Sequence, residues 1–249
     1  SAHGRIKILA DHVEIREQDQ CRQITHNRDP LAVIREWSST HTPAMIPELP
    51  RFWSGFTGYF SYEMVSFFEN IQVSPPEGTP YAHFIIPAEM IIFDNINQTL
   101  TCLDICYIDT QESARDVYNK ARLKLTAMLD TLHAPFVYEN RSSDTQASLV
   151  ALTPEDQYRA GVETIKAHIV EGDIFQAVYS QPFTCRTDAD PIMIYRAQRY
   201  INPSPYMFFM NFSDIVVAGS SPETMVRLEN NIATLRPIAG TRQRGDTEQ

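Results

Sequence analysis

Apolar and polar positions alternate in short runs over the first 110 residues, as half-buried β-strands require. Ile6 and Ile8, and then Val13 and Ile15, alternate on either side of a short polar stretch, which predicts a strand pair. Further strands are predicted over 53–60, 90–94 and 99–107, the last two joined as a hairpin. In the first of these, aromatic residues alternate with glycines, which indicates that another backbone packs closely over them.

Longer segments with apolar residues three and four positions apart predict helices. Asp29-Pro30 and Thr153-Pro154 each place a capping residue before a first-turn proline, and Gly172 ends a helix because glycine accepts the left-handed conformation. The predicted helices cover about 31–37, 62–69, 111–132, 154–171 and 191–200.

Beyond residue 172 the chain returns mainly to short apolar runs separated by tight turns. The predicted strands cover 174–184, 206–212, 215–218, 224–228 and 232–236. Strands joined by tight turns outnumber units in which a helix links two parallel strands. The pattern therefore predicts an α+β fold built on antiparallel sheet.

A polar stretch near residues 140–146 divides the chain. We expect a linker at 140–152 between an N-terminal region, 1–139, and a second region, 153–249. Only four residues follow Gly245, the end of a polar loop, and functional loops are normally held by rigid elements on both sides. We therefore expect the chain to be a fragment.

The charge balance narrows the function classes. The chain has 21 Lys and Arg against 31 Asp and Glu, a formal charge of −10, which excludes general nucleic-acid binding because phosphate neutralisation needs a clustered basic surface. It has no signal-peptide layout and no uncharged apolar run of about 18 residues, so we expect a cytoplasmic protein without a membrane span. Cys102 and Cys106 have no second pair to complete a zinc site, and we expect all four cysteines to be reduced.

Gln176 is the first candidate for chemistry, in the segment Gly-Asp-Ile-Phe-Gln at 172–176. On a strand it would share one face with Val178 and Ser180. Taken alone, it is more often an ordinary polar strand residue than a site residue.

Glu223 is the second candidate, because Gly-Ser-Ser-Pro-Glu at 219–223 places a carboxyl at the end of an apolar strand. A carboxyl beside apolar walls can act as a general acid. A glutamate in a surface turn is at least as frequent an explanation of the same pattern.

Three arginines, Arg236, Arg242 and Arg244, surround Gly240 and Thr241 in the polar loop at 236–245. Arginine binds carboxylates, and glycine permits close backbone approach, so the loop indicates an anionic small ligand. A solvated basic loop is the alternative.

The sequence lacks four common catalytic or nucleotide-binding motifs: phosphate-binding loops, zinc-peptidase motifs, serine-hydrolase motifs and glutaminase motifs.

Together, four segments resemble the chorismate-utilising enzymes, and among them the large, synthase subunits of anthranilate synthases. The resemblance is specific over 153–245 and weaker over 5–110, where it rests on 58–62 and 91–94. It implies antiparallel sheets packed face to face with helices outside, of which this chain holds an incomplete part. The four segments are Gly-Asp-Ile-Phe-Gln (172–176), Asn-Pro-Ser-Pro-Tyr-Met (202–207), Gly-Ser-Ser-Pro-Glu (219–223) and Pro-Ile-Ala-Gly-Thr-Arg-Gln-Arg-Gly (237–245).

The resemblance implies catalytic and substrate-binding roles. The family's reaction displaces the 4-hydroxyl of chorismate, and Glu223 matches the acid that protonates it. Relatives that activate water carry Lys at the position of Gln176, whose neutral amide cannot act as a base, whereas ammonia needs only positioning. Relatives that make aminodeoxychorismate commonly carry Lys where Ala239 stands, so Ala239 favours the anthranilate branch. Gly240 and Thr241 match positions that contact the substrate.

The resemblance also implies ligands and partners. The segment 202–207 resembles part of a tryptophan feedback site, with Pro205, Tyr206 and Met207 as candidates, while the other part, a Leu-Leu-Glu-Ser stretch, is absent from this chain. Mg²⁺ holds the ring carboxylate in the family, but its ligands lie downstream of the 237–245 segment, so no residue of this chain is assigned to the metal. Ammonia is expected from glutamine through a separate glutaminase subunit.

The resemblance implies part of a lyase of tryptophan biosynthesis that converts chorismate and ammonia to anthranilate and pyruvate. We expect this piece alone to be inactive. Two alternatives stay open. One is an aminodeoxychorismate synthase component, and the other is a non-catalytic ligand-binding module with the same fold.

Overall fold

The chain forms two compact units, residues 1–137 and 138–249. The predicted division into 1–139, a linker at 140–152 and 153–249 stays a prediction, since most of that linker lies outside the described residues. A computed structural model describes residues 2–17, 20–44, 46–50, 52–108, 112–135 and 148–238. The α+β class with antiparallel sheets is confirmed in both units.

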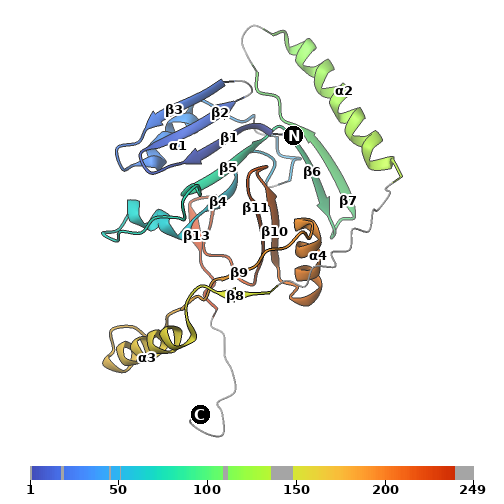
Figure 1. Ribbon diagram of the computed structural model, residues 1–249. Helices are drawn as coiled ribbons and strands as arrows, with labels where there is room; N and C mark the ends of the chain where they lie inside the picture. The colour runs from blue at the N-terminus through green and yellow to red at the C-terminus, as the bar shows by residue number, and fades with distance from the viewer. Residues whose placement is uncertain are drawn as a thin grey trace. The chain divides into compact units, whose positions relative to one another are not determined.

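The first unit is built on a five-stranded antiparallel sheet with strand order β3-β2-β1-β5-β4 (Figure 1). The predicted strand pair is confirmed, because Ile6 lies opposite Ile15 and Ile8 lies opposite Val13. These four side chains are buried and form part of the hydrophobic core of this unit. The strands are β1 (Ala2–Ile8), β2 (His12–Glu17), β3 (Gln20–Thr25), β4 (Thr57–Phe60) and β5 (Ala82–Pro87).

Helix α1 (Pro30–Ser39) covers the buried face of this sheet and begins where the sequence predicts. The Asp29 carboxylate accepts a hydrogen bond from the amide of Ala32 at 3.0 Å, which satisfies one of the free amides at the helix start. Val33 and Trp37 of the helix pack into the core formed by the strands. The predicted helix at 62–69 is a 3₁₀ helix, η1 (Tyr62–Phe67).

Strand β4 is shorter than the predicted 53–60, because the chain bends before Thr57 and Gly55 adopts a φ of +116°. The close backbone approach predicted for the glycines is confirmed at Gly58. A Cβ at this position would collide with the carbonyl oxygen of His83 and the Cα of Phe84 on β5. Gly55 has no such neighbour, so its backbone conformation rather than packing favours glycine there.

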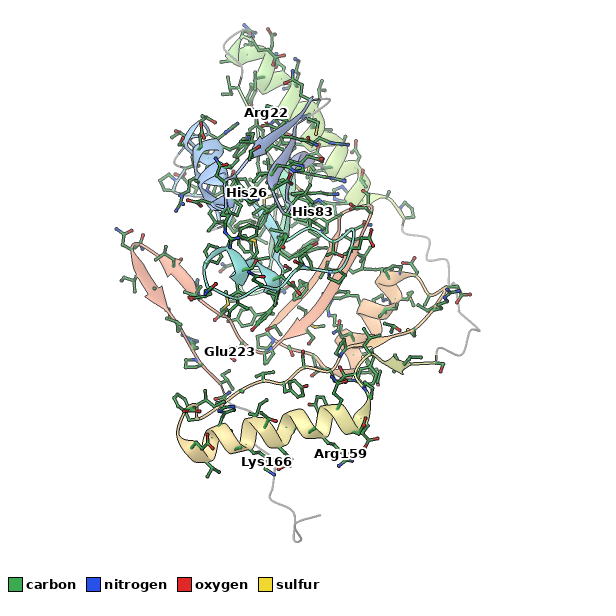
Figure 2. The ribbon with its side chains drawn as sticks, turned by 60° about the vertical axis from the view of Figure 1, so that its left-hand side comes forward. Arg22, His26, His83, Arg159, Lys166 and Glu223 are labelled. Carbon is green, nitrogen blue, oxygen red and sulfur yellow. The ribbon has the colours of Figure 1, made fainter. Side chains whose placement is uncertain are left out.

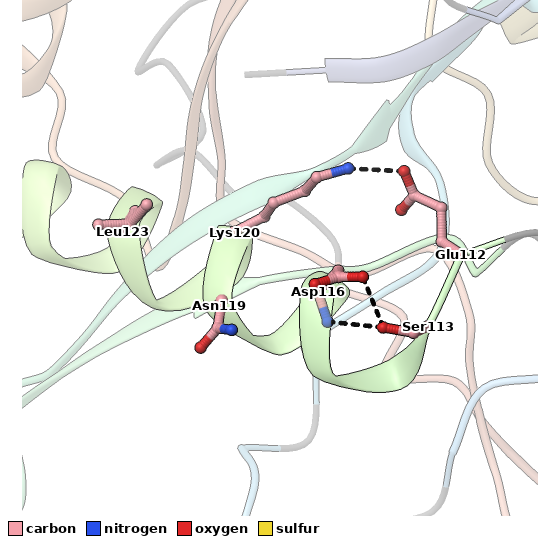
Figure 3. A pocket seen from close by; sticks show the side chains of 6 residues that line it. All are labelled: Glu112, Ser113, Asp116, Asn119, Lys120 and Leu123. Carbon is pink, nitrogen blue, oxygen red and sulfur yellow. Dashed lines mark hydrogen bonds and ion pairs between the residues drawn. The ribbon is translucent and has the colours of Figure 1, made fainter.

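The predicted hairpin is confirmed as β6 (Glu89–Asp94) and β7 (Thr99–Asp104), and α2 (Ala114–His133) packs on β7. Helix α2 begins after the predicted residue 111 because Ser113 is its N-cap. The hydroxyl of Ser113 accepts a hydrogen bond from the amide of Asp116 at 3.2 Å and donates to its carboxylate at 2.6 Å (Figure 3).

The second unit contains two helices and three two-stranded antiparallel sheets among its described residues. The predicted strands beyond residue 205 are confirmed, with bounds that shift by up to three residues. Asn230 and Asn231 form the last turn with φ of 48° and 63°. The elements are β8 (Val150–Ala151), α3 (Glu155–Glu171), β9 (Phe183–Thr184), α4 (Pro191–Ile201), β10 (Tyr206–Asn211), β11 (Val216–Ser221), β12 (Arg227–Glu229) and β13 (Ile232–Thr234).

Helix α3 ends as predicted at Gly172, which adopts a φ of 86°. Its beginning differs from the prediction, because the N-cap is Pro154 rather than Thr153. The carbonyl of Pro154 accepts the first helical hydrogen bond, from the amide of Tyr158, whereas the carbonyl of Thr153 accepts from the Gln181 side chain.

The predicted strand at 174–184 is wrong over most of its length. Only Phe183 and Thr184 form a strand, which pairs with β8. A strand requires hydrogen bonds to a neighbour, and no strand in the described part of the chain pairs with residues 174–182. The alternation of apolar and polar residues within one segment does not show whether such a neighbouring strand exists.

The cysteines and the length of the helices are the last two features of the fold. All four cysteines are free. Within the described ranges, no helix is both long enough and apolar enough to cross a membrane.

Candidate functional site

Glu223 lies two residues beyond the end of β11 and is half-buried (Figure 2). The hydroxyl of Ser221, the last residue of β11, donates to the carbonyl oxygen of Glu223 at 2.9 Å and accepts from its amide at 3.4 Å. The backbone around the carboxyl is therefore fixed by the strand that precedes it. A rigid support of this kind is what a catalytic group requires.

The Glu223 side chain joins two segments that the sequence identified separately. Its Oε1 atom accepts a hydrogen bond from the amide of Ile238 at 3.1 Å. Ile238 is the second residue of the segment 237–245, so the carboxyl lies at the start of the arginine-containing loop. Glu223 and the first residues of this segment are therefore held together by a hydrogen bond.

The hairpin β10–β11 brings a third segment close to Glu223. Tyr206 lies opposite Ser221 and Met207 opposite Ser220, and the Ser220 hydroxyl donates to the carbonyl oxygen of Asn202 at 2.6 Å. The tryptophan-site candidates Pro205, Tyr206 and Met207 therefore lie across the hairpin from the Glu223 segment. Pro205 and Tyr206 are exposed and Met207 is half-buried.

Close packing in the same hairpin explains one glycine of the Gly-Ser-Ser-Pro-Glu segment. Gly219 lies opposite Phe208, and the Phe208 ring occupies the space that a Cβ at residue 219 would need. On the other side, Tyr195 of α4 packs against Phe209, with ring centroids 5.6 Å apart. The hairpin is thus fixed by aromatic packing as well as by its ladder of hydrogen bonds.

Gln176 lies in the irregular segment after α3, and its side chain is exposed. The segment is attached to α3 by Tyr179, whose ring stacks on Tyr158 with centroids 4.9 Å apart and whose carbonyl accepts from the Tyr158 hydroxyl. Among the described residues, no hydrogen bond or ion pair involves the Gln176 side chain. A pocket shared by Gln176 and Glu223 stays a prediction.

Gly240 and Thr241, together with Ala239, Arg242 and Arg244, lie outside the described residues. Arg236 is described and is exposed.

One group of possible metal ligands occurs in the described part of the chain, at the end of α3. Atoms of His168, Glu171 and Asp173 lie within 4.8 Å of one another, all on exposed side chains. The Nδ1 atom of His168 is 2.8 Å from the Asp173 carboxylate, so these two groups already bind each other. Mg²⁺ prefers a set of oxygen ligands, and this group with an imidazole does not fit it.

The Glu17 carboxylate of the first unit contacts several side chains that no sequence pattern predicts to be close, because most of them are far apart in the chain. Glu17 lies 2.5 Å from Arg22, 3.6 Å from the Nε2 atom of His3 and 4.0 Å from the Nε2 atom of His41. The ring of His3 stacks on Tyr107 with centroids 3.5 Å apart.

The environment of this cluster changes two pKa values. Burial lowers the pKa of His3, partly opposed by the Glu17 carboxylate and reinforced by His41. Burial also raises the pKa of Tyr107, and Glu17 acts in the same direction. The neutral forms of both side chains are therefore favoured.

A shallow hollow on the first unit lies at the start of α2 and involves no predicted site residue (Figure 3). Lys120 and Glu112 form an ion pair at 2.6 Å across it, and this hydrogen bond raises the pKa of Lys120. Its charged groups are thus paired, Lys120 with Glu112 and the Asp116 carboxylate with the Ser113 hydroxyl, as is common at the start of a helix.

Comparison with known proteins gives consistent matches along the chain. A family described as "chorismate binding enzyme" matches residues 4–249. Anthranilate synthase component 1 of Pseudomonas putida is 38% identical over 259 residues, which cover 99% of this chain and 50% of that protein. The protein of the same name from Pseudomonas aeruginosa is 34% identical over 256 residues, with 98% and 49% covered.

The fold matches a solved structure of the same kind. The crystal structure of anthranilate synthase component I from Streptococcus pneumoniae TIGR4 aligns with a TM-score of 0.75 and 27% identity, and covers 94% of this chain and 51% of that chain. The chain therefore spans about half the length of the proteins it matches.

Proposed function

Because the chain belongs to the chorismate-binding enzyme family, we propose that it forms part of an anthranilate synthase large subunit, a lyase of tryptophan biosynthesis that converts chorismate and ammonia to anthranilate and pyruvate. The family resemblance predicted from the four segments is confirmed by the match over residues 4–249. The observation that carries the proposal is that relatives named anthranilate synthase component 1 match almost the whole of this chain.

Glu223 is proposed as the acid that protonates the departing 4-hydroxyl of chorismate. Its support is the position of the carboxyl, half-buried after β11 and hydrogen-bonded through Oε1 to the amide of Ile238. This amide fixes one carboxyl oxygen, and a carboxyl needs only the other to deliver a proton. Gly240 and Thr241, a few residues after Ile238, are proposed to contact the substrate.

Gln176 is proposed to face the attacking nucleophile. Its amide can donate and accept hydrogen bonds but cannot remove a proton from water. Ammonia is itself a competent nucleophile and needs only orientation, so an amide at this position favours amination over hydration. Ala239 lacks the amine with which a lysine could attack the substrate, and this favours anthranilate over aminodeoxychorismate as product.

The partners follow from the same assignment. We propose that a separate glutaminase subunit releases ammonia from glutamine, and that tryptophan is a candidate inhibitor through Pro205, Tyr206 and Met207. Magnesium is proposed for the complete enzyme. The described residues include no group of metal ligands made of oxygen atoms only, so no residue of this chain is assigned to the ion.

The test is made on a fusion of this chain with the half of the Pseudomonas putida relative that it does not match. With chorismate, ammonium and Mg²⁺, the fusion is expected to form anthranilate, whereas the 249-residue chain alone is expected to form none. Product analysis by chromatography distinguishes anthranilate from aminodeoxychorismate, and the latter product would contradict the proposal. A fusion that binds chorismate without turnover would favour a ligand-binding module instead.

Glu223→Gln in the fusion tests the acid role directly. The turnover number is expected to fall by about 10²–10⁴-fold, because the amide keeps the size of the side chain but has no proton to deliver. Glu163→Gln is the matched control, since Glu163 lies on α3 with a side chain 69% exposed, paired only with Lys166 among the contacts described. An unchanged rate for the Glu223 variant would remove it from the mechanism.

A further inference from the structure

The segment that carries Gln176 is attached at both ends to α3 or to the residues just before it. At its beginning, the amide of Asp173 donates to the carbonyl oxygen of His168 at 3.0 Å, and the Asp173 carboxylate lies 2.8 Å from the His168 Nδ1 atom. At its end, the Gln181 side chain donates to the carbonyl oxygen of Thr153 at 2.8 Å. No strand in the described ranges pairs with the residues between these two points, so other contacts must hold them.

One such contact is made by Tyr179, whose ring lies over Gly161 of α3. A Cβ added at residue 161 would be 2.6 Å from the Tyr179 Oη atom and 2.7 Å from the ring carbons Cε1 and Cζ. The same ring stacks on Tyr158, with centroids 4.9 Å apart and an angle of 21° between the planes, and the Tyr158 hydroxyl donates to the Tyr179 carbonyl oxygen at 3.1 Å. Helix α3 therefore holds both the side chain and the backbone of Tyr179.

Gly161 is an unfavourable residue for its position, because glycine in the interior of a helix weakens the helix relative to alanine. Its backbone conformation does not require glycine, since the glycines with positive φ among the described residues are Gly55, Gly78 and Gly172. The Tyr179 ring does require it, because the ring occupies the space that a Cβ would need. The contact with Tyr179, rather than the helix, therefore explains the glycine.

Gln176 lies three residues before Tyr179, which is at most about 11 Å along the chain. Its own side chain is exposed, so the place of its amide depends on the backbone that Tyr179 fixes. A Cβ at residue 161 would push the Tyr179 ring away by roughly 1 Å, because contacts of 2.6–2.7 Å would have to lengthen to ordinary van der Waals distances. A displacement of about 1 Å at a reacting group can lower a catalytic rate roughly 100-fold.

We propose that Gly161 and Tyr179 are positioning residues for the Gln176 amide, and that they determine how well the enzyme uses ammonia. The inference rests on the role proposed above for Gln176. The Tyr179 ring acts through the backbone of its segment, and Gly161 acts by leaving room for the ring. Glu223 follows a different strand, β11, so a change at residue 161 should alter the use of ammonia and leave the protonation of chorismate unaffected.

The first measurement is made by NMR on the 249-residue chain and involves no catalysis. We expect a nuclear Overhauser effect between the α-protons of Gly161 and the ring protons of Tyr179. In Gly161→Ala, the amide chemical shifts should change at residues 175–180 and stay the same in β1 and β2. Absence of the Overhauser effect, or unchanged shifts at 175–180 in the variant, would overturn the inference.

The second measurement uses the fusion with the unmatched half of the Pseudomonas putida relative. In Gly161→Ala, the KM for ammonium should rise roughly tenfold or more, while the KM for chorismate and the kcat at saturating ammonium stay close to the parent values. Tyr179→Leu should act in the same direction. Because leucine leaves room for a Cβ at residue 161, the double variant should be no worse than Tyr179→Leu alone, and independent effects that multiply would contradict the shared contact.

Ala160→Gly is the control for the stability of the helix. It changes the helix propensity of α3 at an exposed residue next to Gly161, and it should leave the KM for ammonium unchanged. A rise equal to that of Gly161→Ala would assign the effect to the helix and overturn the inference.

Gln176→Ala separates this inference from the function on which it rests. In the fusion it should raise the KM for ammonium at least as much as Gly161→Ala does. If Gln176→Ala leaves this KM unchanged, the role proposed for Gln176 is wrong, and the inference falls with it. If Gln176→Ala raises the KM and Gly161→Ala does not, the proposed function stands and the positioning role of Gly161 and Tyr179 is wrong.

Discussion

Two glutamates hold together groups that are distant in the sequence. Glu17 contacts His3, Arg22 and His41, and Glu223 accepts a hydrogen bond from the backbone of Ile238. The first arrangement contributes to the pH dependence of stability, and the second connects a proposed acid to the start of a proposed substrate loop. A single side chain therefore links segments that local patterns treat as separate.

The His3 environment predicts how stability depends on pH. Burial lowers the pKa of His3 from its ordinary 6.5, so the unfolded chain binds a proton at a higher pH than the folded chain does. The free energy of unfolding should therefore decrease as the pH falls from about 7.5 through 6.5 and towards the lowered pKa. The measurement is the urea midpoint at pH 7.5 and pH 5.5, followed by the fluorescence of Trp37 and Trp53.

His3→Gln should make this decrease smaller, because glutamine does not titrate. His133→Gln is the control, since His133 is exposed at the end of α2, and it should keep the decrease of the parent chain. A His3 variant with the same pH dependence as the parent would show that burial at this site has no energetic effect.

The candidate site could be predicted from the sequence only in part. Glu223 was identifiable because it follows an apolar strand, and the structure links it to the next polar segment. The Glu17 cluster was not identifiable, because residues 3, 17, 41 and 107 come together only when the strands pair. Their separation along the sequence does not predict this contact. Gln176 was assigned to a strand face, and the described residues form no strand there.

At the scale of elements, features with local causes were the predictable ones. The Asp29 cap, the Gly172 helix end and the hairpin around residues 95–97 each depend on residues a few positions apart. The strand at 174–184 failed because a strand also depends on a neighbour from elsewhere. The alternation of apolar and polar residues shows that the segment prefers an extended conformation. It does not show whether a neighbouring strand is present.

The N-cap of α2 provides a test at this scale. Ser113→Ala removes the hydroxyl that accepts from the Asp116 amide and should destabilise α2 by about 1 kcal/mol (Figure 3). Amide exchange over residues 114–118 and the helical circular dichroism signal measure this loss. Lys120→Gln, which removes only an exposed ion pair, should leave both nearly unchanged, and an equal effect of the two substitutions would contradict the capping role.

For the whole molecule, the two units differ in how much apolar surface they bury. The first unit encloses a core of strands and α1, whereas the second contributes Phe212 to the buried hydrophobic residues described. The sequence pattern predicted a division of the chain near residue 140, but not this difference. Apolar residues occur in both halves, and composition does not tell which of them find partners within the same chain.

This difference predicts the order in which the chain opens. In limited trypsin digestion, sites in 138–249 should be cleaved before sites in the first unit, because local opening is easier where few apolar side chains are buried. Mass spectrometry of the early fragments should find a persistent piece that contains β1 to β5. Equal early cleavage of both units would contradict the prediction. Digestion in urea is the control, because it shows which sites trypsin can cut in the unfolded chain.

Strand β3 ends the five-stranded sheet on one side, and all six of its residues are exposed. An open strand of this kind invites further strands from other molecules, which is how amyloid-like aggregation begins. In this chain the strand carries Gln20, Arg22 and Gln23, and the Arg22 guanidinium is bound to the Glu17 carboxylate of β2. Arg22 thus places a charge on the edge strand, and a charged side chain on an edge strand disfavours its pairing with a further strand.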